Sequence, residues 1–177
     1  PMSHGGGLFH LPYVMQGGIN VVPESGGFEA QECLDLAAYW TEASFFAAPT
    51  MVRRLTDAVK KSGKRPTGLA TICYGGGPMY LADLDEALEL IGPHFAQIYG
   101  QGECPMMITV MPRHMINDPT QPNYRERLAS VGRPNALVST SVDAFLSPRF
   151  CQNPHRKIMR PKYQTWMTTT MMSRIAS

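Results

Sequence analysis

Apolar residues follow two alternating patterns along the first hundred residues. Short continuous apolar runs, which are typical of buried strands, occupy residues 19–24, 43–49, 67–74 and 95–99. Between these runs, apolar residues recur at every third or fourth position, as on one face of a helix, over residues 28–40, 50–63 and 78–91. The chain is therefore predicted to alternate strands with helices.

Residues with special backbone preferences mark the ends of two of these helices. Thr50 is the predicted N-cap of the second helix, and Gly63 ends it. Pro78 suits the first turn of the third helix, and Gly92 suits its end. Parallel strands need crossover connections, and these helices supply them. We therefore predict an α/β fold with a mainly parallel sheet that carries helices on both faces.

Two adjacent predicted strands end in glycine-rich loops, GGGP at 75–78 and GQGE at 100–103. In parallel sheets such loops share one rim, where ligands bind. The first loop lacks side chains where a flat or anionic ligand would lie against the backbone, and a helix N-terminus follows it. Tyr99 adds a ring for stacking, and Glu103 adds an oxygen ligand of the kind Mg²⁺ takes alongside phosphates. Together they predict a nucleotide and metal site.

Each of these signals also has a simpler explanation. Glycine triplets usually mark tight turns, and a tyrosine at the end of a strand more often caps the core than stacks on a ligand. A single acid in a loop is usually solvated. The order of the signals on successive strands favours the ligand site.

The composition is that of a globular chain, with 177 residues of which 44% are hydrophobic and 17% charged. No stretch approaches the ~20 apolar residues that span a bilayer, and the N-terminus lacks signal-peptide features, so the cytoplasm is the predicted location. The cysteines are widely spaced, which predicts neither a zinc site nor a disulfide framework. They are Cys33, Cys73, Cys104 and Cys151.

Charge divides the chain into two parts. Residues 1–138 carry a net charge of −3, whereas residues 139–177 carry +5. The second part has prolines at 148, 154 and 161 and no sustained period of 2 or 3.6, so we interpret it as a poorly ordered basic tail. A basic tail can bind nucleic acid, but without a recognisable motif a solvated segment is favoured, and no nucleic-acid partner is expected.

Four motifs resemble, in their order and approximate separation, those of the adenylate-forming acyl-CoA synthetases of the AMP-binding superfamily. They are PMSHGGGLF (1–9), YGGGPM (74–79), QIYGQGE (97–103) and SVGRP (130–134). The resemblance extends to about Leu137 and implies that residues 1–138 are part of the large N-terminal domain of such an enzyme. It also implies a two-step reaction. A carboxylate attacks ATP to give an acyl adenylate and pyrophosphate, and the thiol of coenzyme A then takes the acyl group.

The resemblance assigns roles to individual residues. The loop along adenine, the polar group at its edge and the stacking ring are matched by Gly75, Gly76, Gly77, Pro78, Gln97 and Tyr99. Two residues match catalytic positions: Glu103 as the Mg²⁺ ligand, and His4 at the wall of the acyl pocket. The simpler alternative for His4 is a turn histidine beside glycines.

The turn before Glu103 departs from the family pattern. Its residues are Gly100, Gln101 and Gly102, which are also assigned to the nucleotide site. Family members often carry a hydroxyl residue at the position of Gly102, where this chain offers only a backbone N–H to the α-phosphate. Cys104 has no partner base nearby, so it is interpreted as structural.

Three hypotheses follow. The first is a fragment of an acid–CoA ligase acting on a medium or long fatty acid or an aromatic acid. The family's upstream phosphate loop, ribose aspartate and C-terminal catalytic lysine do not appear, so this chain alone is expected to be inactive. The second is a non-catalytic nucleotide-binding or interaction module. The third, a dinucleotide-dependent oxidoreductase, is disfavoured because GGGP lacks the G-x-G-x-x-G spacing.

Overall fold

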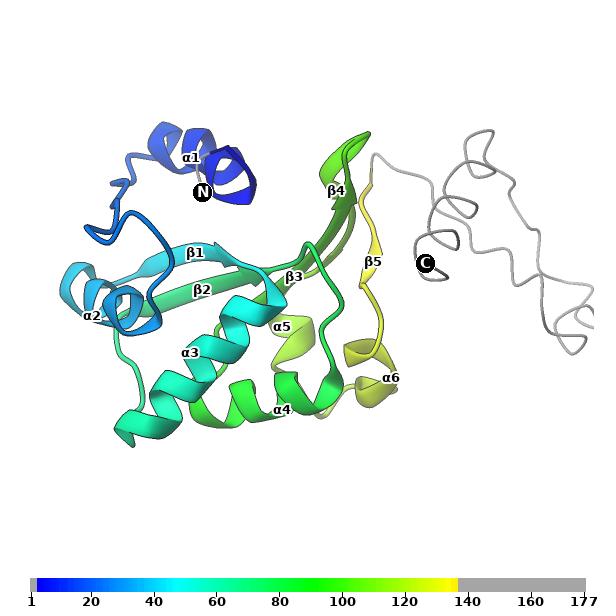
Figure 1. Ribbon diagram of the computed structural model, residues 1–177. Coiled ribbons are helices and arrows are strands. Elements are labelled where there is room, and N and C mark those ends of the chain that lie inside the picture. The colour runs from blue at the N-terminus through cyan, green and yellow to red at the C-terminus, as the bar shows by residue number, and fades with distance from the viewer. Residues whose placement is uncertain (1–2, 137–177) are drawn as a thin grey trace, which may run out of the picture. The chain divides into compact units, whose positions relative to one another are not determined.

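Figure 1 shows the computed structural model of the chain, which describes residues 3–136. Five strands form one sheet in the order β1-β2-β3-β4-β5. Their bounds are Ala43–Ala47 (β1), Leu69–Tyr74 (β2), Phe95–Gln101 (β3), Cys104–Met111 (β4) and Arg133–Pro134 (β5). β2 pairs in parallel with both β1 and β3, whereas β4 runs antiparallel to β3. The predicted α/β class with a mainly parallel sheet is confirmed.

Six helices accompany this sheet. Their bounds are Gly5–Met15 (α1), Ala30–Trp40 (α2), Pro49–Ser62 (α3), Leu81–Leu90 (α4), Arg113–Ile116 (α5) and Tyr124–Leu128 (α6). α3 and α4 are the crossovers that join β1 to β2 and β2 to β3, and they lie side by side on one face of the sheet, while α1 lies on the other (Figure 1). Helices on both faces are therefore also confirmed.

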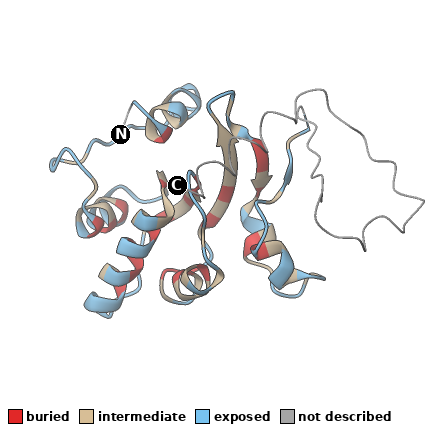
Figure 2. Ribbon diagram, turned by 45° about the vertical axis from the view of Figure 1, so that its right-hand side comes forward, coloured by how far each residue is buried: buried red, intermediate tan, exposed pale blue. Residues whose placement is uncertain are grey.

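The apolar stripes of the crossover helices form the core together with the sheet. Val52, Leu55 and Val59 of α3 are buried, as the helical period predicts, and so are Leu84 of α4 and Ile91 just after it. Figure 2 shows buried stretches along one side of the helices and exposed stretches along the opposite side. The core thus holds the parallel strands in place and leaves their carboxyl ends at one rim.

The predicted ends of these helices are partly right. Gly63 caps α3 in the left-handed conformation with φ 66°, and Gly92 follows α4 with φ 113°. Thr50 is wrong as an N-cap because Pro49 already occupies the first helical position, which its fixed φ suits. Pro78 is wrong as a first-turn residue because α4 starts only at Leu81. The intervening loop first packs Met79 against the core.

The predicted strand at 19–24 is wrong. These residues lie in the loop between α1 and α2 and pair with no strand, and Ile19 and Val22 are 72% and 74% exposed. An apolar run becomes a strand only where a sheet edge accepts its backbone groups, and periodicity cannot reveal that edge. Among the described residues, β1 pairs with β2 alone.

Several helices and strands were not predicted from the sequence, among them α1 and β4. The helix α1 is apolar throughout most of its length, yet Gly5 is its one buried residue, and Leu11 and Met15 are 66% and 81% exposed. β3 continues two residues beyond its predicted end at Tyr99, and β4 follows it as a hairpin. None of the described helices is long and apolar enough to cross a membrane. The predicted tail at 139–177 lies outside the described residues.

Candidate functional site

The GGGP loop follows β2 directly at the carboxyl end of the parallel strands. Gly75 is buried, and a methyl group added there would lie 2.5 Å from the backbone oxygen of Ile98, so the loop starts in close contact with β3. Gly76 adopts φ +79°, which favours glycine, and an added methyl there would still lie 3.8 Å from the nearest atom. Gly76, Gly77 and Pro78 are exposed. The loop therefore presents bare backbone at the rim.

The N-terminal motif lies beside the same loop. His4 is exposed immediately before α1, and its ring centroid is 6.4 Å from that of Phe46 in β1. The far atom of the Phe46 ring, Cζ, is also the atom nearest to an added methyl at Gly76. The structure thus brings two distant motifs, the one with His4 and the GGGP loop, against one ring.

Gln97 lies one strand away from the GGGP loop, in register with Tyr74. The Tyr74 hydroxyl donates to Oε1 of Gln97 at 3.3 Å, and both side chains are buried, at 1% and 8% exposure. Burial raises the pKa of Tyr74 far above its usual range, so the hydroxyl keeps its proton and remains a donor. This bond fixes the amide oxygen of Gln97 toward Tyr74.

Tyr99 and the GQGE segment lie on the β3–β4 hairpin. Cys104 pairs with Gln101, so Gly102 and Glu103 form the two-residue turn at the hairpin tip, and both are exposed. The side-chain amide of Gln101 donates to the Tyr99 hydroxyl at 2.7 Å. The loop predicted over 100–103 is therefore shortened to the two residues Gly102 and Glu103, because the antiparallel pairing holds Glu103 on a tight turn.

Gly100 lies where the hairpin is irregular. The register shifts between Tyr99 and Gln101, and Met106 opposite adopts a positive φ of 62°. A methyl group at Gly100 would overlap the Met106 backbone, with 2.7 Å to its Cα. Glycine is needed here because a bulge on β4 approaches the β3 backbone.

The GGGP and GQGE segments lie at the same end of the sheet, as predicted, but Glu103 comes later along β3 than the residue that the GGGP loop approaches. Gly75 lies against Ile98, and Glu103 follows Ile98 by five residues, a stretch of up to ~17 Å at the rise of an extended strand. None of the described hydrogen bonds or ion pairs joins Glu103 to His4 or to the GGGP loop. The structure places His4 and Gly76 each beside the ring of Phe46, and it places Glu103 in the turn at the tip of the β3–β4 hairpin.

The acidic and thiol groups do not gather into a metal centre. In the part of the chain that is described, no three His, Cys, Asp or Glu side chains are grouped so that they could hold a metal ion. Glu103 is a single exposed carboxylate. Burial raises the pKa of the Cys73 thiol to about 11, and it also raises that of Cys33, so these thiols stay protonated.

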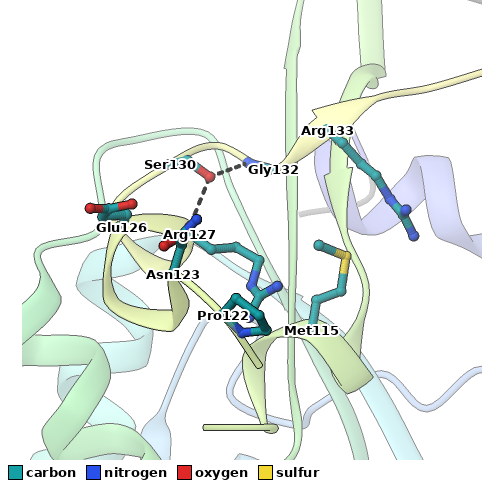
Figure 3. Close-up of a pocket in the computed structure, with 8 residues that line it drawn as sticks. All are labelled: Met115, Pro122, Asn123, Glu126, Arg127, Ser130, Gly132 and Arg133. Atoms are coloured by element: carbon teal, nitrogen blue, oxygen red, sulfur yellow. Dashed lines mark hydrogen bonds between the residues drawn. The ribbon is translucent and has the colours of Figure 1, made fainter. Parts of the chain in front are cut away.

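A separate pocket was missed by the sequence analysis and has a volume of about 400 Å³ (Figure 3). None of the predicted site residues line it. Its lining residues are Met115, Pro122, Asn123, Glu126, Arg127, Ser130, Gly132 and Arg133. The Ser130 hydroxyl donates to the Arg127 carbonyl at 2.7 Å and accepts from the Gly132 amide at 3.1 Å. The SVGRP motif supplies three of these residues and is the sequence signal that could have indicated the pocket.

Arg127 forms the inner side of this pocket. One terminal nitrogen donates to Gln121 at 3.0 Å, while its Nε and other terminal nitrogen are buried without a partner among the described residues. Asp118 accepts from Gln121 and Thr120, and the nearby Arg127 charge helps these bonds to lower the pKa of Asp118. Arg127 therefore anchors the 118–121 loop.

Three comparisons with known proteins bear on this arrangement. The sequence model of the AMP-binding enzyme family matches residues 1–143. The medium/long-chain-fatty-acid–CoA ligase FadD8 of Mycobacterium tuberculosis is 32% identical over 142 residues, which cover 80% of this chain and 23% of that protein. The fatty acid–[acyl-carrier-protein] ligase ScoC of Streptomyces coeruleorubidus is 32% identical over 58% of this chain and 20% of that protein.

Solved structures agree with these relatives. Unliganded o-succinylbenzoate coenzyme A synthetase from Bacillus subtilis matches with a TM-score of 0.58 and 25% identity, over 77% of this chain and 26% of that chain. The amide bond synthetase McbA from Marinactinospora thermotolerans matches with a TM-score of 0.51 and 25% identity, over 62% and 21% of the two chains. This chain therefore spans about a quarter of the length of the proteins it matches.

Proposed function

Because this chain belongs to the AMP-binding enzyme family, we propose that it supplies part of the nucleotide and acyl sites of an acid–CoA ligase. Such a ligase activates a carboxylic acid with ATP and transfers the acyl group to coenzyme A. The observation that carries the proposal is that His4 and the GGGP loop both lie beside one ring, that of Phe46, at the carboxyl rim of a parallel sheet, where ligands bind in this class of fold.

The exposed backbone of Gly76, Gly77 and Pro78 offers a surface without side chains for adenine. Tyr99 and Gln97 would supply the stacking ring and the polar group at the edge of the base. The hydrogen bond from Gln101 to Tyr99 and that from Tyr74 to Gln97 restrict the rotation of both groups before a ligand arrives. Such preorganisation lowers the entropy cost of binding.

Glu103 is the proposed Mg²⁺ ligand. A single exposed carboxylate on a tight turn suits this ion, which binds proteins through one or two carboxylates and completes its shell with water and substrate phosphates. When bound, Mg²⁺ neutralises charge on the phosphate oxygens during attack by the carboxylate. The backbone N–H of Gly102, next to Glu103, is the proposed donor to the α-phosphate.

His4 is the proposed residue at the acyl side, next to the reacting carboxylate. The fatty-acid ligases among the relatives favour a medium- or long-chain fatty acid over an aromatic acid as the substrate. Coenzyme A is proposed as the acceptor because the relative matched over most of this chain, FadD8, is a CoA ligase, and the cytoplasm is proposed as the location.

A non-catalytic nucleotide-binding module is the second candidate. It is favoured because none of the predicted site residues lines the pocket beside Arg127 or a second pocket at Arg54 and Asp57. Glu103 is also exposed in the turn at the tip of the β3–β4 hairpin.

Calorimetric titration with AMP, and with ATP in the presence and absence of Mg²⁺, tests the nucleotide site on this chain. We expect weak binding of both nucleotides, and a Mg²⁺-dependent gain for ATP that Glu103→Gln removes and the exposed control Glu89→Gln on α4 retains. The absence of AMP binding at millimolar concentrations would refute the site.

Pyrophosphate exchange with a panel of fatty and aromatic acids separates the two candidates. This chain alone is expected to show no acid-dependent exchange. Clear exchange that depends on a fatty acid would show that the chain completes adenylation and would exclude the non-catalytic module.

A further inference from the structure

The Phe46 side chain lies between the two motifs that the proposed site requires. Phe46 is in β1, one residue from its carboxyl end, and its ring is partly buried. Successive side chains of a strand alternate between faces, and its neighbour Ala47 is fully buried in the core. Phe46 therefore faces away from α3, toward α1.

On the side of α1, the ring fits only because residue 5 is glycine. A methyl group added at Gly5 would lie 2.5 Å from Cδ1 and 2.6 Å from Cε1 of Phe46, which is closer than carbon atoms can approach. Phe9, one helical turn later, stacks on the same ring with centroids 6.1 Å apart. The Phe46 ring thus sets how closely the start of α1 approaches the sheet, and with it the position of His4.

On the other side, the tip of the ring borders the nucleotide loop. A methyl group added at Gly76 would lie 3.8 Å from Cζ of Phe46, so the ring tip is the nearest neighbour on that side of the glycine. A methyl group added at Gly77 would lie 3.6 Å from Pro49, at the start of α3. The segment that leads from β1 into α3 therefore borders two successive residues of the loop.

We propose that Phe46 is a positioning residue that fixes the separation between His4 and the GGGP loop and couples their movements. An aromatic ring has only two side-chain torsions, so a displacement at its Gly5 edge moves its Cζ tip toward or away from Gly76. A shift of α1 on the acyl side is transmitted to the backbone of the nucleotide loop. The functional importance of this coupling rests on the proposed function, although the ring of Phe46 lies beside both motifs without any ligand.

The test uses Gly5→Ala, which leaves Phe46 in place but forces its ring to move, with Gly27→Ala as the matched control. Gly27 is exposed and has no atom within 4 Å of its Cβ position. The readout is the backbone amide resonances of Gly76 and Gly77 in ¹H–¹⁵N spectra of the ligand-free chain. We expect Gly5→Ala to shift both resonances and Gly27→Ala to leave them in place.

Phe46→Leu and Phe46→Ala extend the test to the ring itself. We expect the two resonances to shift in both variants, and AMP affinity to fall by about threefold in Phe46→Leu and about tenfold in Phe46→Ala, the latter equivalent to about 1.4 kcal/mol. Gly5→Ala keeps the test decisive if Phe46→Ala fails to fold. Unchanged Gly76 and Gly77 resonances in Gly5→Ala and Phe46→Leu would overturn the coupling. Failure of the wild-type chain to bind AMP would refute only the proposed function, because the ligand-free spectra report the coupling independently.

Discussion

Removing the Tyr74 hydroxyl should destabilise the chain and free the Gln97 amide. Tyr74→Phe keeps the ring and its edge contact with Phe95, whose centroid is 6.3 Å away, so only the hydrogen bond is lost. The substitution leaves Oε1 of Gln97, a residue 8% exposed, without its donor. An unsatisfied buried acceptor costs about 1–3 kcal/mol.

The length of the hydrogen bond between Tyr74 and Gln97 indicates a cost in the lower part of the range of about 1–3 kcal/mol. Its O···O distance is 3.3 Å, whereas a strong hydroxyl hydrogen bond measures about 2.7–2.8 Å. We therefore expect a loss of about 1–2 kcal/mol in the free energy of unfolding, measured by urea denaturation followed by circular dichroism. For a chain of this size the melting temperature should fall by about 2–4 °C for each kcal/mol.

A double-mutant cycle isolates the bond. Gln97→Met removes the acceptor at similar volume, so the double variant should lose less stability than the two single variants together. Tyr80→Phe is the control, because Tyr80 is 69% exposed and its variant should change stability by less than about 0.5 kcal/mol. A Tyr74→Phe variant as stable as the control, with an additive cycle, would refute the reasoning.

Three further outcomes are expected. Gly100→Ala, which forces a methyl group into the Met106 backbone, should lower the melting temperature by several degrees, whereas Gly102→Ala at an open position should not. Cys73 should be alkylated slowly at pH 8, because a pKa of about 11 leaves only about 0.1% of the thiol as thiolate. The rate should rise about tenfold for each pH unit up to that pKa, and peptide mapping by mass spectrometry can measure it. Burial lowers the pKa of His94, so its contribution to stability is fully present above about pH 6.5 and is lost as the pH falls through the lowered value. His94→Gln should flatten the pH dependence of urea midpoints over that range, and an unchanged profile would exclude His94 as its source.

The local part of the fold could be predicted from sequence because it depends on nearest neighbours. The helical period in Val52, Leu55 and Val59 and the left-handed caps at Gly63 and Gly92 need no knowledge of distant residues. These features suffice to predict two crossover helices, and crossovers imply parallel strands.

The remaining elements depend on contacts between distant residues. Residues 19–24 have the pattern of a strand but no partner edge, whereas CPMMITVM (104–111) becomes β4 because β3 is available to pair with it. The tight turn at Gly102–Glu103 has no Asn-Gly signature, so the loop appeared longer than it is.

The site shows the same division. The motifs identified His4 and the GGGP loop separately, but Phe46, which lies beside both, belongs to no motif and resembles any strand residue. Its partners are about 30 to 40 positions away along the chain, and no local period links them. The pocket beside Arg127 was missed for the same reason.

The exposed apolar surface of α1 affects how the isolated chain behaves in solution. Leu11 and Met15 on the helix and Val22 beyond it each offer a large side chain whose burial is worth about 1.5–3 kcal/mol. Two copies that cover these residues for each other gain several such contributions, and the gain grows with concentration through mass action. We therefore expect the purified chain to self-associate through this surface as its concentration rises, and dilute, cool storage to favour the monomer because apolar association weakens on cooling.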